Sequence, residues 1–218
     1  MTYFAVILKR DISLALRNGA SLALGPIFYL CLVILFPFGV VPNMKTLSLI
    51  SPAVIWAGPL LATLIGLESL FQPDKNDGSL DLYRLSGHSF EGIIMAKATA
   101  FWIVYVLPLI IISPLFGMML GMEGKIIIGS LIALIIGSPA LIFFGTLCAA
   151  LTLHLKRAGL MMIILAIPLL VPTLIFGVTA STGLAASTTP FTAPLMILGA
   201  LSIFSGCLCA VAGAYILK

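Results

Sequence analysis

Six long stretches without a charged side chain dominate this 218-residue sequence. Each one exceeds the roughly 18 apolar residues that indicate a membrane-spanning helix. Hydrophobic residues make up 61% of the chain and charged residues only 8%, too few to cover the surface of a soluble globule. We therefore predict an all-α membrane protein with six transmembrane helices, in the ranges 20–42, 46–67, 98–122, 126–153, 158–186 and 191–217.

The basic residues predict which way the chain is oriented, because cytoplasmic loops are enriched in lysine and arginine. If the N-terminus is cytoplasmic, only Lys45 and Lys125 fall outside. The other nine then fall on the cytoplasmic side: Lys9, Arg10, Arg17, Lys75, Arg84, Lys97, Lys156, Arg157 and Lys218. We expect both termini to be cytoplasmic. The hydroxyl-rich segment 179–192 then lies outside, and its composition is compatible with a re-entrant element and equally with a plain loop.

The segment before the first span, residues 1–19, is predicted to be an amphipathic helix lying on the inner leaflet. An apolar face is formed by Phe4, Ile7, Leu8, Ile12 and Ala15. The charged residues fall elsewhere on the helix: Lys9, Arg10, Asp11 and Arg17. The alternative, an early start of the first span, would bury these charges in hydrocarbon at several kcal/mol each.

Residues 68–97 are unlike the rest of the chain, because they hold eight charged side chains: Glu68, Asp74, Lys75, Asp77, Asp81, Arg84, Glu91 and Lys97. Asp77-Gly78 predicts a turn, and Gly87 could end the short helix that follows it. That helix would contain Ser79, Leu80, Leu82, Tyr83 and Leu85. Apolar anchors flanked by charges suit docking onto a soluble partner. We predict a cytoplasmic coupling loop over 72–96; the alternative is a solvated loop whose apolar residues lie against the bilayer. The residues of this loop expected to contact an ATPase are Asp74, Asp77, Gly78, Ser79, Leu80, Leu82, Tyr83 and Leu85.

The sequence shows no motif for catalysis or metal binding. HExxH, CxxC, GxSxG and the phosphate-binding GxxxxGK[ST] are all missing. His88 and His154 are expected near the membrane surface, and the four cysteines lie in apolar runs as packing residues. Six spans also leave no room for a nucleotide-binding domain. We expect a single transmembrane domain over 1–218 that is not an enzyme, with no catalytic or metal-binding residues, and with ATP hydrolysis in a separate chain.

The sequence resembles the haem exporter B (CcmB) family, the membrane subunit of an ABC transporter for cytochrome c maturation. The matching pieces follow the family's order: Lys9-Arg10-Asp11 with Arg17, Ser51-Pro-Ala-Val-Ile-Trp-Ala57, Leu67-Glu-Ser-Leu-Phe71, Asp74 with Asp77-Gly-Ser-Leu80, Leu107-Pro-Leu109, Ser113-Pro-Leu115 and Leu155-Lys-Arg157. They extend over nearly the whole chain. The acidic loop and the Lys-Arg turn carry more of the resemblance than general hydrophobicity does.

The resemblance implies an ABC-2 type permease-like bundle in a bacterial-type inner membrane, present as two copies with a cytoplasmic ABC ATPase. It also implies a haem-handling membrane subunit and a periplasmic haem chaperone as partners, and no nucleic acid. Only Trp56 and Trp102 are present and the tryptophan-rich haem motif is missing, so haem ligation is expected in a partner and no cofactor in this chain. The implied role is to couple ATP hydrolysis to haem export or to release of the haem-loaded chaperone. Export of another substrate and a non-transporting scaffold are the alternatives.

Overall fold

The computed structural model describes residues 3–17, 19–39, 44–67, 69–85, 87, 89–155, 158–185 and 191–217. Their helices are, in order, α1 (Tyr3–Arg17), α2 (Gly19–Gly39), α3 (Met44–Leu67), α4 (Gln72–Asn76), α5 (Ser79–Leu85), α6 (Phe90–Phe101), the π-helical η1 (Trp102–Val106), α7 (Leu107–Met119), α8 (Gly124–Thr152), α9 (Ala158–Gly183) and α10 (Thr192–Leu217). The predictions made for Glu68, His88, Lys156, Arg157, Lys218 and residues 186–190 lie outside the described residues.

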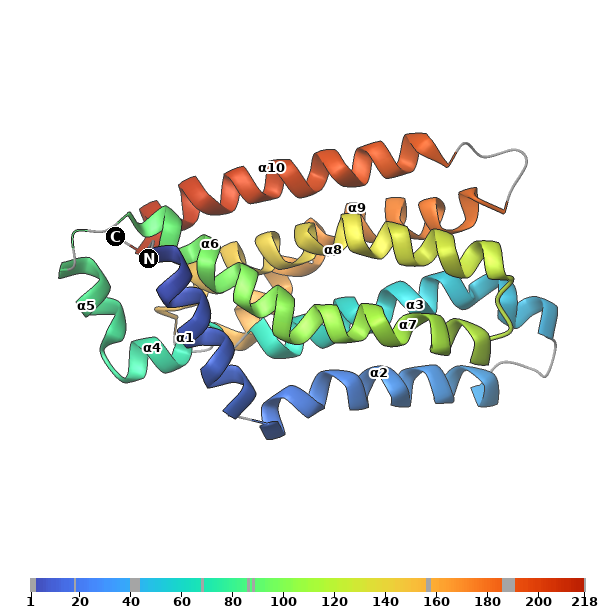
Figure 1. Ribbon diagram of the computed structural model, residues 1–218, viewed down its shortest axis with the longest axis horizontal. Helices are drawn as coiled ribbons and strands as arrows, with labels where there is room; N and C mark the ends of the chain where they lie inside the picture. Colours follow the sequence, from blue (N-terminus) through green and yellow to red (C-terminus); the bar gives the residue numbers. More distant parts are fainter. Residues whose placement is uncertain are drawn as a thin grey trace.

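Long apolar helices form a bundle, which confirms the prediction of an all-α membrane protein (Figure 1). Five helical bodies are long and apolar enough to cross a membrane, and α2 contributes a shorter apolar stretch, Ala23–Gly39. The third predicted span begins earlier than expected, because α6, η1 and α7 form one helical body over Phe90–Met119. The first turns of α6 therefore contain residues 90–96, the last part of the predicted loop 72–96. Residues 179–183 of the predicted outer segment are the last turn of α9.

The middle of the bundle is packed closely through glycines. Trp56 of α3 is fully buried, and its Nε1 donates a hydrogen bond to Ser181 Oγ of α9 at 3.0 Å. A Cβ atom on Gly177 would lie 2.4 Å from the Trp56 ring, and one on Gly145 of α8 would lie 2.1 Å from Leu67. Small residues let helix backbones approach in this way, which is how helices associate in a membrane.

The π-helical segment η1 interrupts the third long helix just before Pro108. Proline has no N–H group, and its ring crowds the carbonyl four residues earlier, here that of Val104. The wider π turn accommodates this, and the N–H of Leu107 bonds the carbonyl of Trp102, five residues back. The helix therefore continues across the proline instead of ending at it.

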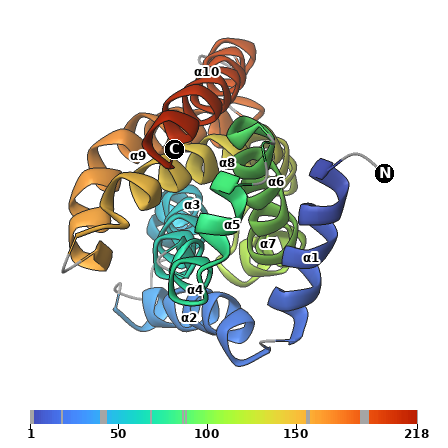
Figure 2. The same cartoon turned by 90° about the vertical axis from the view of Figure 1, so that its left-hand side faces the viewer.

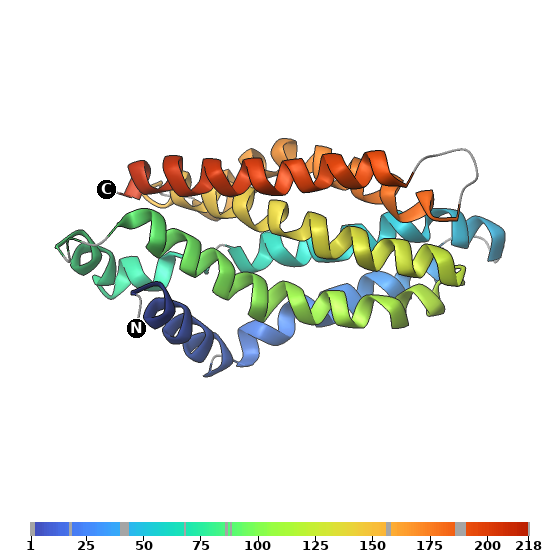
Figure 3. The ribbon, with the colours of Figure 1, turned by 45° about the horizontal axis from the view of Figure 1, so that its top comes forward.

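The short helices gather at one end of the bundle. Figures 1 and 3 show α4, α5 and the start of α1 at the same end as the end of α10. The α7–α8 turn lies at the opposite end. Figure 2 looks at the first end and shows α5 in front of the bundle, with α1 beside α6 and α7. The polar segment and the N-terminal helix, far apart in sequence, therefore meet at this end.

Candidate functional site

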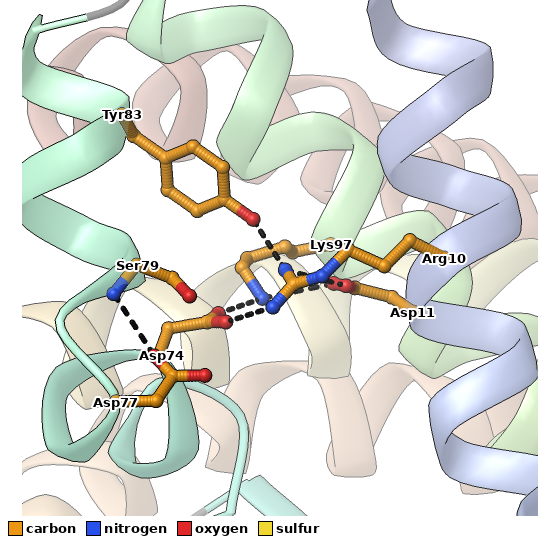
Figure 4. Close-up of polar contacts among 7 residues, drawn as sticks. All are labelled: Arg10, Asp11, Asp74, Asp77, Ser79, Tyr83 and Lys97. Atoms are coloured by element: carbon orange, nitrogen blue, oxygen red, sulfur yellow. Dashed lines mark hydrogen bonds and ion pairs between the residues drawn. The ribbon is translucent and has the colours of Figure 1, made fainter.

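Four charged side chains from three helices meet where α1 crosses the bundle: Arg10, Asp11, Asp74 and Lys97 (Figure 4). Arg10 Nη2 of α1 lies 2.9 Å from Asp74 Oδ1 of α4. Lys97 Nζ of α6 lies 2.8 Å from Asp11 Oδ2 of α1 and also pairs with Asp74 Oδ2. Asp74 therefore holds α4 against two long helices at once. We call these four residues the ion-pair cluster.

The cluster combines deep burial with zero net charge. The side chains of Asp74 and Lys97 are only 5% and 4% exposed, whereas that of Arg10 is 33% exposed. Charges are tolerated at such burial only when they are paired and hydrogen-bonded. Burial alone would lower the pKa of Arg10, but the hydrogen bond and the charge of Asp74 outweigh it and hold that pKa above its usual value.

Two aromatic rings border the cluster. Arg10 Nη1 donates a hydrogen bond to Tyr83 Oη of α5, and the guanidinium carbon lies 5.9 Å from the centre of that ring. Lys97 Nζ lies 5.9 Å from the centre of the Phe71 ring, within cation–π range. Burial, followed by the negative charge of Asp74, raises the pKa of Tyr83 to about 12. Tyr83 therefore stays neutral at physiological pH and serves as an acceptor for Arg10.

Local chemistry shapes the α4–α5 hairpin that carries Asp74. Gly78 has a φ of 76°, a left-handed conformation that glycine adopts without strain, and it turns the chain between the two helices. Asp77 Oδ1 accepts a hydrogen bond from the backbone N–H of Ser79 at 2.9 Å, at the start of α5. That bond lowers the pKa of Asp77. Lys75 Nζ donates to the carbonyl of Leu153 at 2.7 Å and so ties α4 to the end of α8.

The residues predicted to contact an ATPase separate into an inward and an outward set. Leu80 and Tyr83, three positions apart on α5, are buried. Leu82 and Leu85 point the other way and are 66% and 84% exposed. Asp77 is also exposed, and Gly78 and Ser79 are partly so. Asp74 differs from the expected surface position, because its carboxylate is buried in ion pairs and is not presented to a docked protein.

The predicted N-terminal helix forms as α1, but its charges are divided. Lys9 and Arg17 are exposed, whereas Arg10 and Asp11 turn toward α4 and α6. On the predicted apolar face Ile7 is buried, while Phe4 is 38% exposed. The apolar pattern therefore indicates which side of α1 packs against the bundle. Arg10 and Asp11 also face that contact, where they form ion pairs.

Lys97 is the functional-site residue that the sequence interpretation missed. The charge pattern assigns it to a polar cytoplasmic loop, yet it lies inside α6 and is 3% exposed. The available signal was its isolation between apolar residues, from Ile93 to Phe101, because a lone lysine in such a run needs an acidic partner. The identity of that partner depends on the fold.

Comparison with known proteins places the chain in a family. The sequence model of the CcmB protein family matches residues 2–218. The chain belongs to the CcmB family. "Heme exporter protein B" of Bradyrhizobium diazoefficiens is 41% identical over 205 residues, which cover 94% of this chain and 92% of the relative. The protein of the same name from Paracoccus denitrificans is 41% identical over 97% of both chains. The Escherichia coli K12 protein of that name is 38% identical over 89% of this chain and 88% of the relative.

Membership of the CcmB family confirms the resemblance drawn from the N-terminal charges, the acidic loop and the Lys-Arg turn. The match is global, so the bundle and the ion-pair cluster both lie within the family's region. The same family match covers α4 and α5.

Proposed function

We propose that this chain is the membrane subunit of an ABC transporter for cytochrome c biogenesis, and that it couples ATP hydrolysis by a separate ATPase to haem export or to release of a haem-loaded periplasmic chaperone. Its relatives are named for haem export, and its described residues form a membrane bundle with short helices at one end. The chain itself is non-catalytic in this proposal. Haem is the cargo of the complex and is held by a haem-handling membrane subunit, with ATP bound by the ATPase.

The proposal orients the end with α1, α4 and α5 toward the cytoplasm of a bacterial inner membrane, with both termini there. The excess of lysine and arginine assigned to that side supports this orientation. Described basic residues at this end include Lys9, Arg17 and Lys75, whereas Lys45 and Lys125 lie at the starts of α3 and α8. Two copies of the chain with two ATPase subunits would form the complete transporter.

The contact with the ATPase is assigned to the outer face of α5. Leu82 and Leu85 are exposed apolar side chains on a short helix, and the exposed carboxylates of Asp77 and Asp81 flank them. Exposed leucines beside charges can fill an apolar groove of a partner while the charges fix the register. The inner face, with Leu80 and Tyr83, fastens α5 to the bundle.

The single observation that carries the coupling proposal is that Asp74 bonds to both Arg10 of α1 and Lys97 of α6. Movement imposed on the α4–α5 hairpin therefore reaches two long elements through one carboxylate. Because α6, η1 and α7 are continuous, displacement of α6 also reaches the opposite end of the bundle. In this proposal the ATPase moves the α4–α5 hairpin, and the ion-pair cluster transmits that movement to α1 and α6.

Docking can be tested by placing a charge on the outer face of α5. Leu82→Asp and Leu85→Asp should each reduce co-purification of the ATPase by about tenfold, because burying a carboxylate in an apolar contact is costly. Leu155→Asp is the matched control, since Leu155 is 50% exposed and follows α8, outside α5. Equal ATPase retention in all three variants would refute the assignment of α5 as the docking helix.

The coupled step can be tested in vesicles that contain the whole complex. Haem movement and release of the haem-loaded chaperone should be measured separately, with active ATPase and with a hydrolysis-dead form that still assembles. Loss of at least one output with the dead ATPase supports coupling. Full retention of both outputs would show a scaffold and contradict the proposal.

A further inference from the structure

A cavity of about 510 Å³ lies between α1, the α3–α4 connection and the α6–η1 helix. This is within the size range of ligand sites in proteins. Asp74 and Lys97 form part of its wall, so the cavity adjoins the ion-pair cluster. The exposed leucines of the proposed docking face, Leu82 and Leu85, do not line it, although Asp77 beside them does. The cavity therefore needs an explanation of its own.

The wall of the cavity changes from charged to aromatic along one helix. Lys97, Phe101 and Tyr105 are spaced four residues apart along α6 and η1, and all three line the cavity. Four residues are about one helical turn, so the three side chains share a face over about 12 Å. Leu14 of α1 and Leu70 add apolar surface to the wall. Such a gradient matches the passage from the headgroups of a membrane into its acyl chains.

Among the described residues, three basic and three acidic side chains line the cavity, and the third acid, Asp77, accepts a hydrogen bond from Ser79. Arg10 and Lys97 are neutralised by Asp11 and Asp74. Arg17, the last residue of α1, also lines the cavity, is exposed, and makes no hydrogen bond or ion pair with the described part of the chain. A guanidinium matches the geometry of a phosphate group.

The position of α1 favours a ligand that comes from the membrane. Leu14 and Leu16 near its end are 50% and 63% exposed, as expected of a helix at the lipid interface. Haem, the proposed cargo, also combines acidic groups with an apolar ring. However, among the described residues that line this cavity there is no histidine, cysteine or methionine, and Tyr105, the one side chain there of a type that ligates haem iron, has its ring stacked on Phe101.

We propose that the cavity binds one membrane phospholipid, with its phosphate on Arg17 and the upper part of its acyl chains along Leu14, Phe101 and Tyr105. The lipid fills the space between α1 and α6 beside the ion-pair cluster. The site shares Asp77 with the edge of the proposed docking face, but lipid binding to the purified chain needs no ATPase, so the lipid proposal stands or falls separately from the coupling role.

Native mass spectrometry of the purified full-length chain can test this site with three probes. Dioleoylphosphatidylglycerol should bind at one site per chain. Dioleoylglycerol has the same tails without the phosphate and should bind at least fivefold more weakly. Inorganic phosphate, which lacks the tails, should not displace the bound lipid at millimolar concentration.

Two substitutions address the two halves of the site. Arg17→Gln should weaken phosphatidylglycerol binding about fivefold, the effect of one basic residue at an anionic surface. Lys9→Gln is the matched control, because Lys9 is an exposed cation of α1 that does not line the cavity, and it should leave binding unchanged. Ala15→Trp, which fills the cavity from α1, should remove the tight site.

Three results would overturn the proposal. One is equal binding of dioleoylglycerol and dioleoylphosphatidylglycerol, which would show that the phosphate is not recognised. Another is an equal effect of Arg17→Gln and Lys9→Gln. The third is displacement of the lipid by inorganic phosphate or by haem, either of which would assign the cavity to a different ligand.

Discussion

Two regions of this protein are held together by different kinds of contact: the middle of the bundle and the ion-pair cluster at its charged end. In the middle, α3, α8 and α9 touch through glycines, and the buried Trp56 makes one hydrogen bond to Ser181. In the cluster, charged side chains reach between helices, and Arg10 remains 33% exposed. Packing by shape tolerates little change in side-chain volume, whereas a buried ion pair requires both partners, because an uncompensated buried charge is costly. The middle of the bundle should therefore be sensitive to added volume, and the junction of α1, α4 and α6 should be sensitive to loss of a charge.

The largest expected effect is loss of the carboxylate that joins the three helices. Asp74→Ala leaves Arg10 without its 2.9 Å partner and removes one of the two partners of Lys97. We expect a loss of about 3 kcal/mol in the free energy of unfolding, measured by denaturation in detergent micelles. Glu91→Ala, which changes an exposed acid at the start of α6, should stay within about 0.5 kcal/mol. Equal stability of the two variants would show that the cluster does not hold these helices together.

The next largest effect is expected from adding volume to the middle of the bundle. Gly177→Ala puts a methyl group 2.4 Å from the Trp56 ring, so the helices must move apart. Overpacking of this kind costs about 1–3 kcal/mol. At Gly199 the nearest atom to an added methyl group is 3.8 Å away, so Gly199→Ala should leave the melting temperature unchanged or slightly raised. A Gly177→Ala variant as stable as Gly199→Ala would contradict the close-packed interior.

A smaller effect is expected at Tyr83, one of the two aromatic residues beside the ion-pair cluster. Tyr83→Phe keeps the ring over Arg10 and removes the hydroxyl that accepts its hydrogen bond. The expected loss is about 1 kcal/mol in the free energy of unfolding. Tyr215→Phe serves as control, because Tyr215 is 86% exposed on α10. If both variants unfold alike, the Arg10–Tyr83 bond contributes nothing to attachment of α5.

The smallest effect is a dependence on pH confined to the α4–α5 hairpin. The N–H of Ser79 stabilises the ionised Asp77, whose pKa is lowered. The stabilisation is therefore complete above the usual pKa of 3.8 and is lost as the pH falls through the lowered value. At neutral pH the α5 amides should exchange more slowly than in Asp77→Asn, and this difference should disappear as the pH falls through the lowered pKa. A difference that persists below that range, or one that is absent at neutral pH, would contradict the assignment.

Much of the fold can be predicted from the sequence, because the membrane imposes a length and a polarity on each span. The six uncharged stretches and the amphipathic pattern before Arg17 correspond to α2, α3, α6–α7, α8, α9, α10 and α1. The start of the third span was predicted at 98 and lies at Phe90. That error arose because Lys97 was assigned to a loop, and only its buried partners make it acceptable inside a helix.

The candidate site could be predicted only as a region. The sequence places Asp74, Asp77 and the leucines of α5 in one polar segment. It does not indicate that Asp74 meets a residue 64 positions earlier, because that pairing depends on how α1 crosses the bundle. Likewise, three-residue spacing groups Leu80 with Tyr83 and Leu82 with Leu85, but the side that faces the bundle is a tertiary property.

The most direct test of the central claim, that Asp74 couples the proposed docking hairpin to the bundle, is the coupled output per ATP hydrolysed by the assembled complex. Asp74→Asn should leave ATP hydrolysis in place once the complex is assembled, while release of haem or haem-loaded chaperone per ATP falls at least tenfold. Glu91→Gln, which changes an exposed acid at the start of α6 outside the ion-pair cluster and the docking face, should match the unchanged protein. An Asp74→Asn complex with an unchanged output per ATP would contradict the claim.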